Sequence, residues 1–266
     1  MLICADGTTV GSLSGGCLEE EVAQCALEVM RTGKPDVMEF DTRRRFGCNG
    51  TIEILVEALQ ETFVLDLADA FRIRRSCRAV TDSRLGTRML AHDETAPLGA
   101  LVQEIAPPIQ LIIFGEGPDS VPLQSFAEIL GWHVIETERA ETLPNAVDTR
   151  TAAVVKSHNY GRDFAALQRL LQLDLRYVGL LGPRKRRDQL LGDLLDIGVS
   201  INAELFAPAG FDFRAETPEE IALAIVAEIQ AIFAEGTGES LRNRKAPIHG
   251  WNIAPAQSNE CAASAQ

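Results

Sequence analysis

From residue 109 onward, the sequence alternates short apolar runs with longer segments of helical periodicity. The run at 109–114 is almost entirely apolar, which is typical of a parallel strand buried on both faces. The pattern predicts strands at 109–114, 132–135, 151–155 and 177–181, and helices at 123–130, 164–171, 184–197 and 219–233. Strands that alternate with helices of this length predict a doubly wound, parallel, Rossmann-like α/β sheet.

The first hundred residues predict a smaller α+β domain with one clear helix. Apolar residues from Leu18 to Val29 recur at helical spacing, and Gly33 ends the segment. Cys25 falls on the apolar face of this helix, so we interpret it as a core residue. Short strands are expected at 52–56, 78–81 and 88–91.

Two changes of composition mark the domain boundaries. Pro107 and Pro108 favour an extended linker, because consecutive prolines remove backbone donors. From Thr237 onward the chain is polar, rich in small residues and aperiodic. We therefore predict an N-terminal domain at 1–105, a Rossmann-like domain at 109–236 and a flexible tail at 237–266.

Charge and cysteine usage narrow the class of protein. The net charge of −13 argues against nucleic acid or an anionic membrane as a partner. The six cysteines form no Cys-x-x-Cys pair and no zinc-finger spacing. The opening residues, MLICAD, reach a charge too soon for a signal peptide, and the most apolar helical segment, 221–233, is too short to span a bilayer. We expect a soluble, reduced, cytoplasmic protein.

Cys17 and Cys48 each have glycine neighbours near the start of the chain. Cys17 belongs to SGGCLE at 14–19, where a turn leads into a helix, and Cys48 belongs to FGCNGT at 46–51, just before an expected strand. Glycine allows positive φ and close ligand approach, and a helix N-terminus favours the reactive thiolate. The carboxylates at 19–21 oppose thiolate formation. The pattern indicates thiols placed to meet a ligand.

A glycine motif follows the first strand of the predicted sheet. Gly115, Gly117 and Ser120 stand in the order G-x-G-x-x-S between a strand and a helix, as a dinucleotide fingerprint requires. Glu138, or alternatively Glu136, lies near the usual place of a ribose-binding acid. Pro118 and Pro122 remove backbone donors that would cradle a phosphate. The motif predicts a Rossmann-type sheet and leaves nucleotide binding open.

Polar residues also follow the third strand, at 156–163. Ligands of open α/β sheets bind at the carboxyl ends of the strands, so His158 could donate a proton or bind a ligand there. His158 could equally satisfy the local turn. For Asp163 we favour a helix cap.

Four cations at 184–187 begin the helix that follows Gly182. Positive charge is disfavoured at a helix N-terminus by about 0.3–1 kcal/mol per residue. This placement favours a bound anion such as a phosphate, with Arg184 as a candidate ligand, or an acidic partner surface. The alternative is a solvated helix face on which Arg184 pairs with Asp188.

The segment AETPEEI at 215–221 is a well-formed helix start. Thr217 is expected as the N-cap, Pro218 as the first helical residue, and Glu220 as the second member of a capping box. We interpret these carboxylates as structural.

Taken together, the motifs resemble the xanthine dehydrogenase accessory factor family, XdhC/CoxI. The stretches that carry the resemblance are GSLSGGCLE at 11–19, GCNG at 47–50, IFGEGPD at 113–119, SHNY at 157–160 with Asp163, GLLGPR at 179–184 and AETPEEIA at 215–222. They occur in family order and extend to about residue 248. Similar proteins carry an additional stretch before the strand that begins here at Met1, so the chain resembles an N-terminally shortened member. Arg214 stands where a glycine is usual.

The resemblance implies an accessory protein, more a cofactor-insertion chaperone than a turnover enzyme. It implies binding of molybdenum cofactor, delivery of the sulfurated cofactor to a molybdenum hydroxylase of the xanthine dehydrogenase type, and homodimers. A cysteine desulfurase is a further possible partner. Cys17 and Cys48 match the family's cysteines and are expected to face the metal, a role that suits soft thiolates. The cofactor-binding residues expected on this basis are Gly15, Gly16, Cys17, Glu19, Cys48, Gly50, Gly115, Gly117, Ser120, Glu138, His158, Gly182 and Arg184.

Two other functions are compatible with the sequence. One is an NAD(P)-dependent oxidoreductase that uses the glycine loop and Glu138. The other is a non-catalytic scaffold that docks a dehydrogenase.

Overall fold

The computed structural model describes residues 1–16, 18–41, 43, 50–82, 86–144 and 147–245. These residues divide into two units, of which the first spans Met1–Ala106 and the second begins at Pro107. Residues 246–266 of the predicted tail, and both Cys17 and Cys48, lie outside the described residues. The described part of the tail contains a short 3-10 helix, η2 (Leu241–Asn243).

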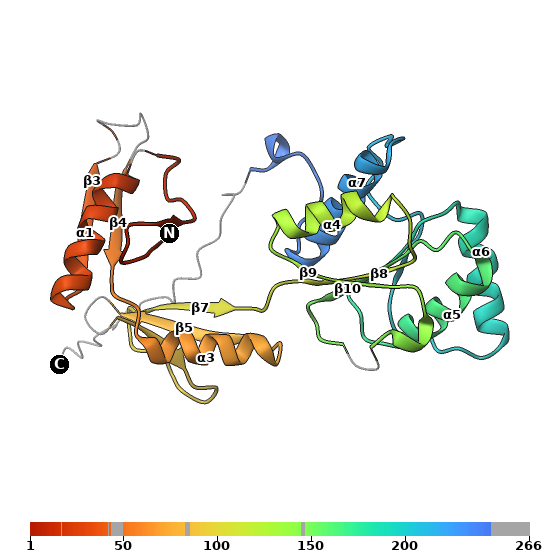
Figure 1. Ribbon diagram of the computed structural model, residues 1–266, viewed down its shortest axis with the longest axis horizontal. Coiled ribbons are helices and arrows are strands. Elements are labelled where there is room, and N and C mark those ends of the chain that lie inside the picture. Colours follow the sequence, from red (N-terminus) through yellow and green to blue (C-terminus); the bar gives the residue numbers. More distant parts are fainter. Residues whose placement is uncertain (17, 42, 44–49, 83–85, 145–146, 246–266) are drawn as a thin grey trace, which may run out of the picture. The chain divides into compact units, whose positions relative to one another are not determined.

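The second unit is built on a five-stranded parallel sheet (Figure 1). Its strands are β8 (Gln110–Phe114), β9 (His133–Thr137), β10 (Thr151–Val155), β11 (Tyr177–Leu180) and β12 (Leu205–Phe206). Their spatial order is β12-β11-β10-β8-β9, with parallel pairing throughout. Numbered along the chain, this is the doubly wound order 2-1-3-4-5, which confirms the predicted Rossmann-like class.

Helices cover both faces of this sheet. Ile112 and Phe114 of β8 pack with α5 (Tyr160–Leu170) and α6 (Arg184–Asp196) in one core. Their neighbours Leu111 and Ile113 pack with α4 (Ser120–Ile129) and α7 (Pro218–Phe233) in the other. Every residue of β8, β10 and β11 is buried. A strand that is covered on both faces requires mostly apolar side chains, which explains the apolar run at 109–114.

The start of α7 follows the prediction. Thr217 accepts a hydrogen bond from the backbone N–H of Glu220, and the Glu220 carboxylate accepts from the backbone of Thr217, which completes a capping box. Pro218 occupies the first turn, where a missing N–H has no cost. This cap fixes where the helix begins at the carboxyl edge of the sheet.

The described part of the first unit contains small antiparallel sheets and two long helices, α1 and α3. Its elements are β1 (Leu2–Ile3), β2 (Thr9–Val10), α1 (Glu19–Thr32), β3 (Asp36–Asp41), β4 (Thr51–Val56), α3 (Glu61–Arg72), β5 (Cys77–Asp82), β6 (Gly86–Leu90) and β7 (Leu101–Ile105). The strands pair as β1-β2, β3-β4 and β6-β5-β7. The helix α3 and the strands β2, β3 and β7 are additions to what the sequence predicted.

Candidate functional site

The carboxyl ends of β8, β10 and β11 lie along one edge of the parallel sheet, because these strands are neighbours and run the same way. From β8 the chain turns to β9 on one side, and the later strands add on the other side, so the direction of winding reverses between β8 and β10. Open α/β sheets bind ligands at such a switch point. The residues that follow β8 and β10 therefore form the candidate site.

The glycine loop after β8 is tightly packed against neighbouring atoms of the carboxyl edge. Gly115 has φ +117°, and a Cβ there would lie 2.7 Å from the backbone N of Ser157. Gly117 has φ +127°, and a Cβ there would lie 2.7 Å from Oδ1 of Asp119. Both positions need glycine because another part of the edge occupies the space. The loop leads from β8 into α4, the context that the motif predicted.

A buried lysine joins the loops after β8 and β10. Lys156 is fully buried, and its Nζ donates to Oδ1 of Asp119 at 2.9 Å and to the backbone O of Glu116 at 3.1 Å. A buried ammonium needs such partners, because desolvation of an unpaired charge costs several kcal/mol. Asp119 is 24% exposed, so this carboxylate is where the pair meets solvent.

His158 reaches the same carboxylate from the loop after β10. Its Nε2 lies 3.5 Å from Oδ2 of Asp119, and 64% of its side chain is exposed. The residue has φ +54°, a conformation that histidine adopts more readily than most residues. Within the turn, the Oγ of Ser157 accepts from the N–H of Asn159 and donates to Oδ1 of Asp163. The His158 ring is thus directed to another loop and not used by its own turn.

Asp119 is held in its charged form. Burial raises the pKa of this carboxyl, but the hydrogen bond and charge of Lys156, together with bonds from His158 and the backbone, outweigh burial, and the net pKa is below its usual value. Only one oxygen is bonded to Lys156. The site therefore presents a fixed, ionised carboxylate beside an exposed imidazole.

A cavity of about 430 Å³ opens beside this cluster, between α4 and α7. We call it the α4/α7 pocket. It is lined by Glu116, Gly117, Pro118, Asp119, Leu123, Lys156, His158, Leu181, Glu216, Pro218, Ile221, Ala222 and Ile225. Apolar side chains from both helices form its walls, and its charged groups come from the carboxyl edge.

Asp163 is not the helix cap that the sequence predicted. Asn159 caps α5 instead, since its Oδ1 accepts from the N–H of Arg162 at 3.0 Å. Because the cap lies earlier, the helix begins at Tyr160, four residues before the predicted start. Asp163 is fully buried and accepts from Ser157 through Oδ1 and from Arg186 through Oδ2. It therefore ties the loop after β10 to α6.

The cations at the start of α6 fall into two groups. Arg186 pairs with Asp163 at 2.5 Å, and Arg187 pairs with Asp188 at 2.6 Å, so the alternative pairing of Arg184 with Asp188 is wrong. Arg184 and Lys185 are exposed, and neither has an ion-pair partner within the described ranges. Gly182, with φ +155°, leads into this turn directly after Leu181 of the pocket wall. Arg184 and Lys185 are thus two cations at the carboxyl edge that have no ion-pair partner in the described part of the chain.

Glu138 is engaged by other side chains. The neighbouring Glu116 carboxylate raises the pKa of Glu138, and Oε2 of Glu138 lies 3.7 Å from Nη2 of Arg162. The competing candidate, Glu136, accepts from Gln124 at 2.8 Å. A second cavity, of about 560 Å³, adjoins these acids and includes Ser120. The Oγ of Ser120 is buried without a hydrogen-bond partner in the described structure.

In the first unit, the carboxylate of Glu19 holds the loop that precedes α1, which we call the cysteine loop. Its carboxylate accepts hydrogen bonds from the backbone N–H groups of Leu13, Ser14, Gly16 and Leu18, and from the hydroxyls of Ser12 and Ser14. These bonds, with that from the Ser14 backbone the largest cause, hold its pKa far below the usual value. Gly15 and Gly16 have positive φ, which the loop requires. The donors that could meet an anion are occupied by the chain's own carboxylate.

The described cysteines offer no metal centre. Cys25 is half-buried against the α1 core, and burial and Asp36 raise its pKa; burial also raises the pKa of Cys77. Cys4 is exposed. Among the described residues there is no group of three or more His, Cys, Asp or Glu side chains that could hold a metal ion. Gly50, which together with Gly15, Gly16 and Glu19 makes up the described part of the predicted site in this unit, has φ +156°.

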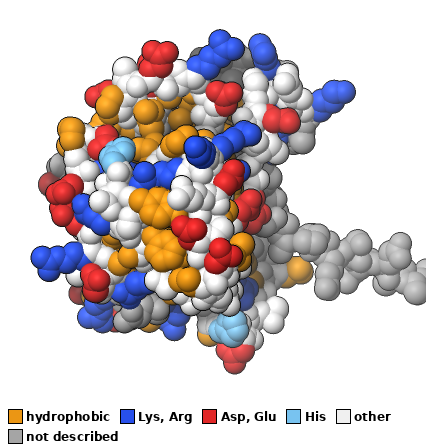
Figure 2. All heavy atoms as spheres, turned by 90° about the vertical axis from the view of Figure 1, so that its right-hand side faces the viewer, with side chains coloured by type: hydrophobic (Ala, Val, Ile, Leu, Met, Phe, Trp, Pro, Cys, Tyr) orange, Lys and Arg blue, Asp and Glu red, His pale blue; other side chains and the backbone are white. Residues whose placement is uncertain are grey.

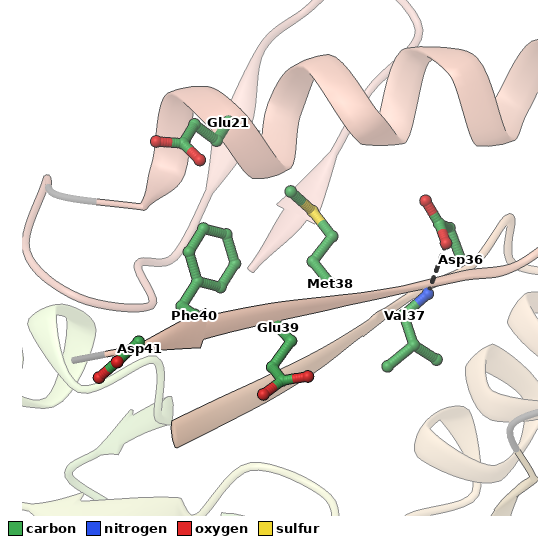
Figure 3. A pocket seen from close by; sticks show the side chains of 7 residues that line it. All are labelled: Glu21, Asp36, Val37, Met38, Glu39, Phe40 and Asp41. Atoms are coloured by element: carbon green, nitrogen blue, oxygen red, sulfur yellow. Dashed lines mark hydrogen bonds between the residues drawn. The ribbon is translucent and has the colours of Figure 1, made fainter. Parts of the chain in front are cut away.

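A pocket of about 410 Å³ in the first unit is strongly acidic. It runs along β3 and is lined by Glu21, Asp36, Val37, Met38, Glu39, Phe40 and Asp41 (Figure 3). Met38 and Phe40 point towards α1, whereas Val37 and Glu39 point to the other face of the strand. Its carboxylates make it a poor match for an anionic ligand.

The carboxyl edge of the sheet thus brings together three predicted site residues, Gly115, Gly117 and His158. It also contains Lys156 and Asp119, which were not predicted as site residues from the sequence. A signal for Lys156 existed, because it directly follows the fully apolar strand at 151–155. A charge in that position requires a partner. Nothing in the sequence indicated that the partner is Asp119.

Comparison with known proteins agrees with this architecture. A family model described as the XdhC Rossmann domain matches residues 111–229, and one described as the XdhC and CoxI family matches residues 1–41. The chain belongs to the XdhC and CoxI family. The first match covers the sheet of the candidate site, and the second covers the loop that contains Cys17.

Two curated relatives of this XdhC and CoxI member span most of its length. A Bacillus subtilis protein, named as a probable subunit of xanthine dehydrogenase, is 28% identical over 290 residues, which cover 86% of each chain. The Escherichia coli molybdenum cofactor insertion chaperone PaoD is 24% identical over 251 residues, which cover 87% of this chain and 77% of PaoD. A crystal structure described as a xanthine dehydrogenase from Bacillus halodurans has a TM-score of 0.73 and 26% identity, and covers 90% of this chain and 87% of that one.

Two further observations on this XdhC and CoxI family chain concern its surface charges and its helices. Lys and Arg side chains are interspersed with Asp and Glu side chains across the face shown in Figure 2. Within the part of the chain that is described, no helix combines the length and the apolar character needed to cross a bilayer.

Proposed function

We propose that this protein binds molybdenum cofactor in the cytoplasm and passes it to a molybdenum hydroxylase of the xanthine dehydrogenase type. Its family membership and its similarity to a chaperone named for molybdenum cofactor insertion support an accessory role in the maturation of such an enzyme. The cofactor is cargo here: a pterin that carries a phosphate and holds molybdenum through two sulfur atoms. Homodimers and a cysteine desulfurase partner remain part of the proposal.

The observation that carries the proposal is the pair of free cations at the carboxyl edge. Arg184 and Lys185 begin α6 without ion-pair partners in the described ranges, next to a glycine with φ +155°. Helix N-terminal N–H groups and two cations form a good environment for a phosphate. The helix bears the electrostatic cost of these charges, and a bound phosphate would offset it.

Soft thiolates suit the sulfur-rich end of the same cargo. Cys17 and Cys48, which lie outside the described residues, stay predicted contacts for molybdenum or its sulfur. Cys4, exposed in the same unit, offers a matched control thiol.

Purification from cells that make molybdenum cofactor, followed by assay of molybdenum and oxidised pterin per chain, tests the proposal. We expect Cys48→Ala and Arg184→Ala to lower cofactor retention with an unchanged melting temperature, and Cys4→Ala to retain it. Full retention by both Cys17→Ala and Cys48→Ala would contradict the thiol role. A chain that never retains molybdenum or pterin would contradict the function.

A nicotinamide nucleotide is the second candidate ligand, favoured by the cavity at the start of α4 and by the unpartnered Ser120 Oγ. Against it, the Glu116–Glu138 pair would repel a diphosphate, and Glu138 already interacts with Arg162. NADH or NADPH at millimolar concentration should then raise the melting temperature, and Glu138→Gln should alter that shift. A melting temperature that both nucleotides leave unchanged would eliminate this candidate.

A further inference from the structure

The α4/α7 pocket combines apolar walls with the carboxylates of Asp119, Glu116 and Glu216, of which Asp119 is fixed by its bond to Lys156. Its volume of about 430 Å³ lies within the range of small-molecule pockets, about 300–1,000 Å³. Pro118 and Leu123 line one side, Ile221 and Ile225 line another, and Leu181 comes from the end of β11. Walls of this kind favour a flat ring whose two faces pack against apolar side chains.

The polar recognition element of the pocket is Asp119. Oδ1 is bonded to Lys156 at 2.9 Å, whereas Oδ2 makes only a long 3.5 Å contact with His158. A carboxylate can accept about four hydrogen bonds, so Oδ2 has capacity for donors from a ligand. Since Lys156 is fully buried and cannot itself be reached, it acts as a positioning residue that orients the carboxylate.

A carboxylate selects ligands that present N–H donors. The 2-amino-4-oxo ring of a pterin has an N–H and an amino group side by side, and an ionised carboxylate accepts from such an edge through charge-assisted bonds. The same pocket wall leads from Leu181 through Gly182 to the free Arg184. We therefore expect the phosphate-bearing substituent of a ring in the pocket to extend towards the cationic start of α6.

We infer that the α4/α7 pocket holds the pterin ring of the cargo, with Asp119 accepting from its 2-amino-4-oxo edge. This inference rests on the proposed function and specifies the part of the cargo that the second unit binds. His158 lines the pocket beside this carboxylate, with its Nε2 3.5 Å from Oδ2 of Asp119.

Fluorescence titration of the 266-residue chain with free pterin tests the inference, with lumazine as the matched ligand. Lumazine carries a carbonyl where pterin carries the amino group, so it presents an acceptor to Asp119. We expect pterin to bind about tenfold or more tightly than lumazine, because hydrogen bonds to charged groups are strong. Equal binding of the two ligands, or no binding of either, would overturn the assignment.

Two tryptophan variants on α7 locate the site. Ile221→Trp fills the pocket and should abolish pterin binding, whereas Leu223→Trp, at a position that is 47% exposed and outside the pocket lining, should bind as the wild type. Asp119 is left unchanged, because its removal would strand the buried Lys156. Wild-type affinity in Ile221→Trp would overturn the inference.

Cofactor retention separates this inference from the function on which it rests. If Ile221→Trp retains molybdenum cofactor as well as wild type while Cys48→Ala does not, the pocket assignment fails and the proposed function stands. If pterin binds with the expected selectivity but no chain retains molybdenum, the proposed function fails and the pocket remains a pterin site.

Discussion

The ammonium of Lys156 lies 2.9 Å from Oδ1 of Asp119, and the lysine side chain has no exposure to solvent. The same nitrogen donates to the backbone of Glu116, so one side chain holds the loop after β8 against the end of β10. These two strands flank the point where the winding of the sheet reverses. The ion pair therefore fixes the geometry of the candidate site.

Lys156→Met retains the length of the side chain and removes its charge. Asp119 would then be left partly buried without its cation. Removal of one partner from a buried ion pair costs about 3–5 kcal/mol, and we expect the lower end of that range because Asp119 is 24% exposed. Urea unfolding measures this loss, and tryptophan fluorescence in a Trp251→Phe background reports on Trp132 alone, since the chain has two tryptophans.

The double variant Lys156→Met/Asp119→Asn provides the control. It removes both charges, so it should recover part of the stability lost in the single variant. A double variant less stable than Lys156→Met would contradict a role for the charge pair.

The glycines at the carboxyl edge give a second prediction. Gly115→Ala introduces a Cβ 2.7 Å from the backbone N of Ser157, at a positive φ. We expect a loss of about 3 kcal/mol or more, because backbone cannot move aside as a side chain can. Gly161→Ala, where the nearest atom is 3.6 Å away in a helix, should change stability by less than about 1 kcal/mol. Similar melting temperatures for the two variants would contradict this account of the loop.

The parallel sheet could be predicted because its strands are buried on both faces, which demands the apolar runs seen at 109–114 and 151–155. The helix start at Thr217 could be predicted because a capping box is local. The helix α3 was missed, since Val64 and Leu65 are exposed while only Phe63 and Ala70 are buried, and Gln60 provides no side-chain cap. Phe63, Leu67, Ala70 and Phe71 do form one face at helical spacing, but the exposed Val64 and Leu65 obscure that period in the sequence.

Contacts distant in sequence could not be predicted. Lys156 and Asp119 are 37 residues apart, and Asp163 and Arg186 are 23 apart. Each pair meets only because strand order and register bring the ends of neighbouring strands together. The cap assigned to Asp163 failed for the same reason: a local rule favoured it, and a buried arginine contact determined its role.

Glu19→Gln tests whether the cysteine loop is held by its own carboxylate. The amide retains one acceptor oxygen and loses the charge that strengthens four backbone bonds and two hydroxyl bonds. We expect faster hydrogen–deuterium exchange at residues 12–18 in the absence of any ligand. Glu20→Gln, an exposed neighbour, should leave exchange unchanged. If the loop of Glu19→Gln exchanges as slowly as that of the wild type, Glu19 does not hold the loop, and its carboxylate is free to contact a cofactor.

Tyr177 provides a prediction for alkaline pH. Its hydroxyl is fully buried and donates to Oε2 of Glu228 at 2.7 Å, and burial, followed by the charge of Glu228, raises its pKa well above the usual value. The unfolded chain ionises near pH 10, whereas the folded chain keeps the proton. The stabilising contribution of this residue is therefore fully present below about pH 10 and decreases as pH rises further.

Tyr177→Phe should cost about 1–2 kcal/mol at neutral pH, because Glu228 loses a donor and, among the described residues, keeps the N–H of Gly210 alone. Above about pH 10 the stability difference between wild type and variant should shrink. Ionisation of the Tyr177 phenol then stabilises the unfolded wild type, and the variant has no phenol at this position to ionise. Urea midpoints from pH 7 to pH 11 measure both effects, and Tyr160→Phe should keep most of the alkaline decline because that hydroxyl is not buried. A stability difference that stays constant across this range would mean that the Tyr177 phenol ionises as readily in the folded chain as in the unfolded one.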